Sequence, residues 1–147
     1  MNTNKKTLIL IGGAVVFKDY RGRRKFMLVA QKEGDGWEIP KVAVRKGESS
    51  VRAVIRMTGE QAGMNARVLE EAGRINGFTT VAEKSVPQRQ LFYLMFQKSG
   101  GEIVGFEKFE WLEHDKAVKR LTLKREKEML RAAKSVLKEW EKTNKLK

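Results

Sequence analysis

The chain of 147 residues contains no cysteine and a single histidine, His114. The absence of cysteine excludes disulfide bonds, thiolate nucleophiles and zinc sites with cysteine ligands. A lone histidine excludes a metal site built from several histidines of one chain. The sequence also lacks any apolar run approaching the roughly 20 residues that a membrane-spanning helix needs. These absences favour a soluble, cytoplasmic protein without a membrane partner.

Residues 1–17 combine a basic start with a short apolar run, an arrangement that signal peptides share. Residues 12–17 continue into a strand pattern, however, and no small-x-small cleavage site follows. We therefore expect this segment to enter the folded part of the chain. The length, the 41% of hydrophobic residues and the absence of repeats or linkers indicate one domain over 1–147, with a core at about 7–142 and a basic tail at 143–147.

Charge of one sign dominates the chain. Lysine and arginine number 31 against 18 aspartates and glutamates, so the net charge is +13 and the sequence pI is about 10.1. Such a balance favours polyanion partners. The alternative is a protein that is basic only for solubility, and the distribution of the charge bears on the choice.

The last 33 residues, 115–147, hold 12 cations against 5 acids, a net of +7. On a helix that turns 100° per residue, seven of these 12 cations, the six named below and Lys145, fall within an arc of about 80°. Apolar residues occupy a separate face that we expect to dock on a sheet: Leu130, Ala133, Val136, Leu137 and Trp140. The outward cations, the basic stripe, are Lys124, Lys127, Arg131, Lys134, Lys138 and Lys142.

A stripe of this kind can contact phosphates without reading a base sequence, which makes RNA or a ribonucleoprotein a possible partner. A plain solvated helix face is the alternative. The basic turn at residues 21–24 would extend the stripe if the fold brings the two together.

Alternation and turn residues predict the remaining elements. Ser49 or Ser50 is expected to cap a helix that runs to about Ala62 and stops at Gly63. A short helix is expected over 114–121, and Thr122 is expected to cap the final helix, which ends near Lys142. Strands are expected over 7–17, 26–31, 65–78, 90–97 and 103–112, with a short extended stretch over 37–44, a hairpin turn at Arg21-Gly22 and a polar loop over 79–89 that contains Pro87.

Residues 36–64 read GWEIPKVAVRKGESSVRAVIRMTGEQAGM, which resembles a Nudix box. The family pattern is G, five residues, E, seven residues, then R-E-U-x-E-E-x-G-U, where U is a bulky aliphatic residue. Val42 stands at the first glycine, Glu48 at the spaced glutamate, Arg56 at the arginine and Gly63 at the last glycine. The chain is therefore similar to the Nudix hydrolase superfamily, with a degenerate box.

The resemblance extends over roughly residues 8–140. Residues 12–17 resemble the family's first core strand, residues 37–41 its W-x-[LF]-P-K lead-in, and residues 109–112 its C-terminal E-x-W segment. The layout is most similar to the diadenosine tetraphosphate hydrolase branch. The resemblance implies an α/β fold, namely an α/β/α sandwich with a mixed central sheet and a long C-terminal helix.

In the family, the box helix presents three carboxylates on one face, and these hold Mg²⁺ or Mn²⁺ for diphosphate hydrolysis. Here that face reads Met57, Glu60, Gln61, so three formal charges become one. One charge pair at 4 Å is worth roughly 4 kcal/mol at an effective dielectric near 20, so the loss weakens metal binding by several kcal/mol. No catalytic set is intact, and Glu60, together with Glu48, is the remaining candidate metal ligand.

Residues beside the box supply further candidates. Trp37, Lys41 and Arg45 are candidates for nucleotide binding, although an aromatic such as Trp37 is more often a core residue. Arg56 is expected either to pair with Glu48 or to bind an anion. Acids outside the box could complete a metal site, and the spacing does not select among Glu70, Glu71, Glu83, Glu110 and Glu113.

The sequence makes predictions about the backbone at three positions: Val42, Gly47 and Gly59. A β-branched residue resists positive φ, so Val42 either reshapes its loop, with Gly47 taking over the turn, or extends a strand. Gly59, inside the helix, costs roughly 0.8–1.0 kcal/mol relative to alanine. Either the helix is not selected for rigid metal geometry, or the glycine allows close packing against another backbone.

Three functions remain open. The leading hypothesis is a Nudix-fold protein with impaired or absent pyrophosphohydrolase activity that binds RNA, a ribonucleoprotein or a nucleotide through a basic surface. The alternative is an active Mg²⁺-dependent hydrolase of nucleoside-diphosphate linkages, of the dinucleoside polyphosphate type, with a reduced metal site. The third is a nucleotide sensor that binds its ligand without turnover.

Overall fold

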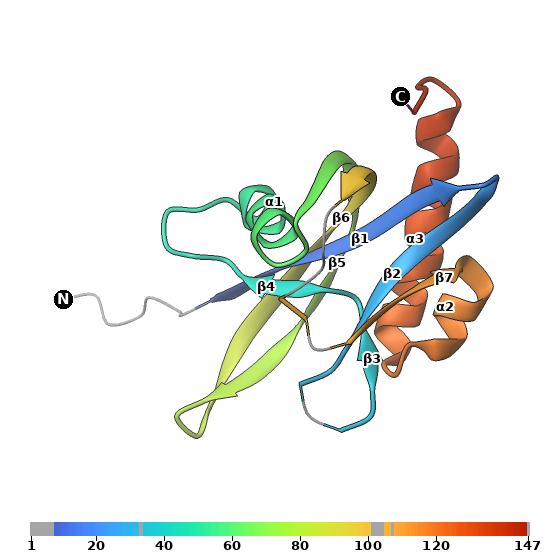
Figure 1. Ribbon diagram of the computed structural model, residues 1–147. Coiled ribbons are helices and arrows are strands. Elements are labelled where there is room, and N and C mark those ends of the chain that lie inside the picture. The colour runs from blue at the N-terminus through green and yellow to red at the C-terminus, as the bar shows by residue number, and fades with distance from the viewer. Residues whose placement is uncertain (1–7, 33, 101–104, 107, 147) are drawn as a thin grey trace.

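The computed structural model describes residues 8–32, 34–100, 105–106 and 108–146 and contains seven strands and three helices within them (Figure 1). Alternating apolar residues form the strands, and the two longest helices are amphipathic. In chain order the elements are β1 (Ile9–Tyr20), β2 (Arg23–Ala30), β3 (Trp37–Glu38), β4 (Lys41–Ala43), α1 (Ser50–Glu60), β5 (Met64–Val81), β6 (Lys84–Gly100), β7 (Phe109–Glu113), α2 (His114–Arg120) and α3 (Lys124–Glu141).

All seven strands belong to one mixed sheet. The strand order is β3-β2-β1-β6-β5, with β4 paired to β1 and β7 paired to β2. β1 and β6 run parallel from Ile9↔Gln88 to Phe17↔Phe96, and the other pairs are antiparallel. α1 lies on one face of the sheet, and α2 and α3 lie on the other (Figure 1). The expected α/β/α sandwich with a mixed central sheet is confirmed.

The alternation of side chains along β1 divides the interior into two cores. Val15 and Phe17 face α2 and α3 and join a cluster that includes Leu130 and Leu137. Ala14 and Val16 point the other way and join a cluster with α1. The apolar face expected on the final helix therefore docks on the sheet, with Leu130, Ala133 and Leu137 buried and Val136 and Trp140 partly buried.

α1 begins and ends as the sequence predicts. The Ser49 side chain accepts a hydrogen bond from the Arg52 N–H at 3.2 Å, and the helix stops shortly before Gly63, whose φ is 55°. Gly47 carries a turn at φ 79°, and Val42 pairs with Gly12 between β4 and β1. Val42 thus extends a strand, while a glycine five residues later makes the turn.

The loop expected over 79–89 is wrong, because β5 and β6 form a long hairpin there. Its tight turn is made by Ala82 and Glu83, both with positive φ (49° and 66°). Pro87 pairs with Phe78 inside the hairpin, and the pairing of β6 with β1 starts only at Gln88. Proline is tolerated where one strand edge needs no N–H, so Pro87 did not end the strand.

Two other boundaries differ from the sequence prediction. Of the strand expected over 103–112, residues 103, 104 and 107 lie outside the described residues, and among the described ones the strand starts at Phe109. α3 is capped by Leu123 without a side-chain hydrogen bond, not by Thr122. The Thr122 hydroxyl instead accepts the Trp37 N–H at 2.8 Å, which ties the start of α3 to β3. No helix in the described part of the chain is long and apolar enough to span a membrane.

Gly59 has no packing reason within the described residues. It is exposed in the last turn of α1, and a Cβ placed there would meet no atom within 4 Å. The close packing expected at this position is therefore wrong. Gly59→Ala is expected to raise the free energy of unfolding by about 0.5–1 kcal/mol in urea titrations, because alanine loses less backbone entropy in a helix.

Gly47→Ala is the matched control, since φ 79° is unfavourable for alanine and this change should destabilise the fold. A loss of stability in Gly59→Ala would contradict the prediction and would reveal a contact on that face of α1.

Candidate functional site

A bidentate ion pair joins Arg56 and Glu48 within the box. Arg56 Nε donates to Glu48 Oε2 at 2.8 Å, and Arg56 Nη2 donates to Oε1 at 2.9 Å. The Arg45 N–H adds a third bond to Oε1 at 3.0 Å. The Arg56 guanidinium, then the Arg45 N–H, lower the pKa of Glu48 to about 2. Of the two roles expected for Arg56, the structure places it in the pair with Glu48, and Nη2 also donates to the Ala43 carbonyl.

This geometry makes Glu48 a loop anchor. Both of its carboxylate oxygens already accept hydrogen bonds, and only 16% of its side chain is exposed. The pair closes the segment between β4 and α1 onto the helix. A metal ion would have to displace Arg56 to reach this carboxylate.

Met57 occupies the centre of the former metal face and is fully buried. It lies in the α1-side core with Val16, Met27 and Met95. Phe106 packs on the same cluster from the chain that follows β6. Apolar side chains therefore fill the position where the family places a carboxylate, and a thioether offers no hard ligand to Mg²⁺.

Gln61, at the last carboxylate position, is covered by the backbone of Gly105. The Gly105 N–H donates to the Gln61 carbonyl at 2.7 Å. A Cβ at residue 105 would lie 2.4 Å from the Gln61 Cβ, so only glycine allows this approach. The segment of Gly105 and Phe106 thus lies directly on the C-terminal end of α1.

Glu60 alone keeps an exposed carboxylate on the box helix. Across the described residues, no group of three histidine, cysteine or acidic side chains is arranged to hold a metal. Of the outside acids, Glu110 pairs with Arg120 at 2.6 Å and Glu113 with Arg23 at 3.4 Å. Glu71 pairs with Arg74, and Glu70 and Glu83 are exposed. The residues that the structure describes do not fit the family's Mg²⁺ site.

The three nucleotide-binding candidates are not gathered around α1. The half-buried Trp37 ring packs against the core under α3, with the Arg120 Cζ 5.5 Å from its centroid. Lys41 Nζ contacts Glu126 Oε2 and lies 2.7 Å from Glu38 Oε1. Arg45 is exposed in the loop before α1. Trp37 therefore lies on the opposite side of the sheet from Met57.

Sequence reasoning missed a cation on the α1 side. The Lys18 ammonium lies 4.3 Å from the centroid of the Trp111 ring, a cation–π geometry. Burial, and then the neighbouring Lys25, lower the pKa of Lys18. The signal was available, because Lys18 follows Ala14 and Val16 at the two-residue period of β1 and so shares their face.

The basic stripe lies on α3 as expected, but its members differ in solvent exposure. Five of the six are exposed, whereas Lys127 is half-buried and donates to the Val118 and Lys119 carbonyls at 3.0 and 3.2 Å. Lys127 therefore caps the end of α2. Lys142 pairs with Glu139 at 2.9 Å.

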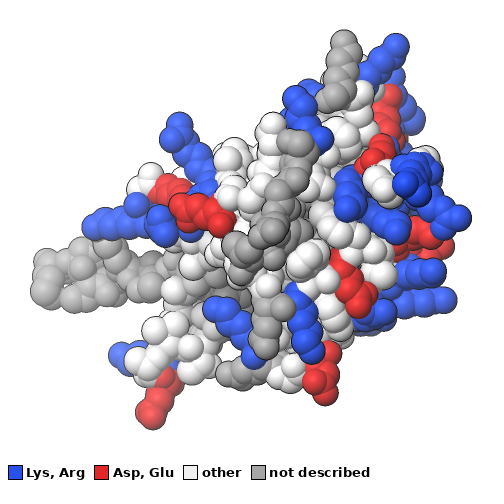
Figure 2. All heavy atoms as spheres, viewed as in Figure 1, with Lys and Arg blue, Asp and Glu red and all other residues white. Residues whose placement is uncertain are grey.

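The basic turn between β1 and β2 reaches the end of α3. Arg24 forms a bidentate pair with Glu141, at 3.2 and 3.1 Å, while also pairing with Asp19. These carboxylates raise the pKa of Arg24. Figure 2 shows lysine and arginine side chains over this side of the molecule, with acidic side chains among them. The turn thus adjoins the stripe.

Comparison with protein-family models identifies the family of this chain. The family model for the NUDIX domain matches residues 11–133. The chain belongs to the Nudix family. No curated protein sequence matches it.

Solved Nudix structures share the fold at low sequence identity. A Caenorhabditis elegans Ap4A hydrolase in a binary complex has a TM-score of 0.71 at 21% identity, over 89% of this chain and 98% of its own. The NUDIX domain of Shewanella oneidensis NrtR, complexed with ADP ribose, has a TM-score of 0.66 at 16% identity, over 90% of each chain. The Escherichia coli dihydroneopterin triphosphate pyrophosphohydrolase has a TM-score of 0.66 at 11% identity, over 82% of this chain and 91% of its own.

Glu48→Gln is expected to lower the melting temperature at pH 7, because it removes the charge that Arg56 binds. The pKa of Glu48 in the fold, about 2, lies below its ordinary value of 4.5. Its stabilising contribution is therefore complete above about pH 4.5 and is lost as the pH falls toward 2. Thermal unfolding between pH 7 and pH 2 should show the difference from the parent protein shrinking over that window.

Glu70→Gln is the matched control, because it removes an exposed carboxylate that has no ion-pair partner among the described residues, and it should leave the melting temperature at pH 7 nearly unchanged. A difference for Glu48→Gln that stays constant down to pH 2 would contradict the role of the ion pair.

Met57→Glu tests whether the former metal face is now core. A carboxylate buried among Val16, Met27 and Met95 is expected to lower the free energy of unfolding by about 3 kcal/mol or more. Met57→Leu, which conserves volume, should cost less than about 1.5 kcal/mol. Urea titrations with and without Mg²⁺ measure both, and a Mg²⁺-dependent recovery of Met57→Glu would show that the position still faces a metal-competent site.

Proposed function

We propose that this protein is a Nudix domain that has lost diphosphate hydrolysis and binds RNA through the basic surface of α2 and α3. The observation that carries the proposal is the full burial of Met57 in an apolar cluster, where the family holds a metal-binding carboxylate. The box keeps its structural pair, Arg56 and Glu48, and lacks the ligand set. The box residues that match the family, Arg56 and Glu48, therefore support the folding of the loop before α1 rather than metal binding.

The basic surface supports the binding half of the proposal. Exposed cations of α2 and α3 lie on the side of the sheet away from the box helix. Three of the five acids on α2 and α3 are occupied, since Lys41 binds Glu126, Lys142 binds Glu139 and Arg24 binds Glu141. Asp115 and Glu128 remain exposed. Among the described residues, the exposed cations of this surface without an acidic partner are Lys116, Lys119, Lys124, Arg125, Arg131, Lys134, Lys138 and Lys145.

RNA binding is expected to depend steeply on salt. A footprint of about four phosphates predicts a slope near −3 in log K against log salt, at about −0.7 per phosphate of a single strand. Filter binding of an unstructured RNA at several salt concentrations measures it. Lys124→Ala/Arg131→Ala should weaken binding and reduce the slope by about 1.4.

Lys46→Ala/Arg52→Ala is the matched control, because it removes two exposed cations from the α1 side. RNA affinity that is negligible at low salt, or that both double variants reduce equally, would overturn the proposed surface.

Hydrolysis is tested separately. Dinucleoside polyphosphates, NAD and nucleoside triphosphates, incubated with Mg²⁺ or Mn²⁺, are expected to remain intact with the parent protein and with Glu60→Gln alike. Turnover by the parent protein that Glu60→Gln abolishes would reject the loss of catalysis and restore the reduced-metal hydrolase.

A further inference from the structure

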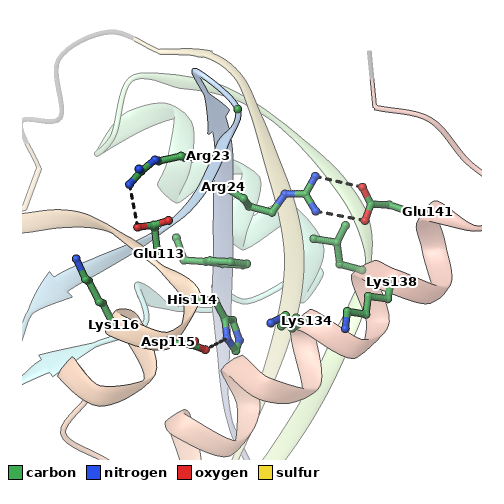
Figure 3. A pocket seen from close by; sticks show the side chains of 12 residues that line it. Arg23, Arg24, Glu113, His114, Asp115, Lys116, Lys134, Lys138 and Glu141 are labelled. Atoms are coloured by element: carbon green, nitrogen blue, oxygen red, sulfur yellow. Dashed lines mark hydrogen bonds and ion pairs between the residues drawn. The ribbon is translucent and has the colours of Figure 1, made fainter.

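A pocket of about 540 Å³ opens on the α3 side of the sheet, away from the box helix (Figure 3). Three separate parts of the fold meet there: the turn between β1 and β2, the start of α2 and the C-terminal half of α3. Its volume is within the range of roughly 300–1,000 Å³ that small-molecule sites occupy. The residues that matter for its chemistry are Phe26, His114, Lys116, Lys134, Leu137 and Lys138.

The charged side chains around this pocket divide into paired and unpaired groups. Arg24 is bound by Asp19 and Glu141, and Arg23 lies 3.4 Å from Glu113. The charges of the four pocket residues among these, Arg23, Arg24, Glu113 and Glu141, are therefore largely neutralised (Figure 3). Asp115 also lines the pocket, with a side chain that is 93% exposed and an Oδ1 that lies 3.6 Å from His114 Nδ1 (Figure 3). Three lysines against this one carboxylate leave the pocket with net positive charge.

That charge comes from three lysines on two helices. Lys116 belongs to α2, and Lys134 and Lys138 lie four residues apart on α3 (Figure 3). None has an acidic partner within ion-pair distance in the described part of the chain. Ammonium groups on different sides of one pocket suit a compact anion with several oxygens and more than one charge, as a phosphate monoester is.

The floor of the pocket is apolar. The Phe26 and His114 rings meet edge to face at 5.4 Å, with Leu137 beside them. His114 Nε2 donates to the Leu130 carbonyl at 3.1 Å in the tautomer that this acceptor requires, which fixes the ring in place. Phe26 and Leu137 are only 2% exposed, so a ligand here would meet the lysines at the rim and the accessible part of the His114 ring below. A phosphate at the lysines with a nucleoside body against the imidazole fits this arrangement.

We infer that this pocket is a second ligand site of the protein, which binds a nucleoside phosphate monoester. Two sources carry this chemistry, a free mononucleotide and the phosphorylated end of an RNA chain. The site is separate from the box. It shares Lys116, Lys134 and Lys138 with the basic surface proposed to bind RNA, whereas Lys124 and Arg131 do not line it and so distinguish the two.

The protein supplies its own reporter for this site. His114 is the single histidine of the chain, so its ring proton resonances are unique in a spectrum. Titration with AMP, followed by NMR on the whole chain, is expected to shift the His114 ring signals saturably. Adenosine, which lacks the phosphate, is expected to bind at least about tenfold more weakly, because the lysines then have no anion to contact.

Matched variants separate this pocket from the outer surface. Lys134→Ala/Lys138→Ala should raise the Kd for AMP about tenfold or more, whereas Lys134→Arg/Lys138→Arg should keep most of the affinity. Lys124→Ala/Arg131→Ala removes the same charge from the same helix and should leave AMP binding unchanged. Circular dichroism melts establish that each variant is folded.

A comparison of RNA ends identifies the source. Oligonucleotides with a 5′-phosphate that bind more tightly than their 5′-hydroxyl counterparts, with the gain lost in Lys134→Ala/Lys138→Ala, would assign the pocket to RNA ends. AMP binding without that gain would assign it to free mononucleotides. Equal binding of AMP and adenosine, no shift at His114, or equal losses in both alanine variants would overturn the site, whatever the outcome for RNA on the outer surface.

Discussion

The arrangement of this protein depends on a buried ion pair between Lys41, at the start of β4, and Glu126, in the first turn of α3. Only 2% of the Glu126 side chain is exposed, and its second oxygen accepts the Ile39 N–H at 2.8 Å. A buried carboxylate without such partners would be strongly unfavourable. The pair therefore ties the segment that leads to the box helix to the first turn of the terminal helix, beside the hydrogen bonds between Trp37 and Thr122.

The Nudix fold can persist without the family's carboxylates on the box helix, because folding and metal binding depend on different residues. Arg56 and Glu48 close the loop before α1 through hydrogen bonds that need no metal. Met57 replaces a carboxylate and joins the core, so the helix gains apolar burial where it would otherwise carry charge repulsion. The backbone of Gly105 then lies on Gln61, in a position that only a glycine can occupy. Met57 and Gln61 thus depart from the family's carboxylate pattern, while α1 stays packed on the sheet.

Local sequence patterns predicted much of the fold, whereas the rest depends on tertiary contacts. The box spacing, the Ser49 cap and the apolar face of α3 were predictable, since each depends on residues close in sequence. The β5–β6 hairpin was not, because polar residues and Pro87 suggested a loop, whereas pairing partners far away in sequence held them in strands. The same limit applied to Lys41 and Lys127. Both read as free cations, and both are bound by groups that only folding brings near.

The sheet separates the molecule into two electrostatic environments. On the α1 side, the box acids are few, one of them is neutralised by Arg56, and Lys18 lies against Trp111. On the α3 side, Glu126, Glu139 and Glu141 are bound to Lys41, Lys142 and Arg24, so among the described acids of α2 and α3 only Asp115 and Glu128 lack a lysine or arginine partner. These ion pairs occupy most of the acids, while most of the lysines remain exposed and unpaired in the described residues. A surface that holds its cations in this way attracts anions without needing any residue of the box to take part.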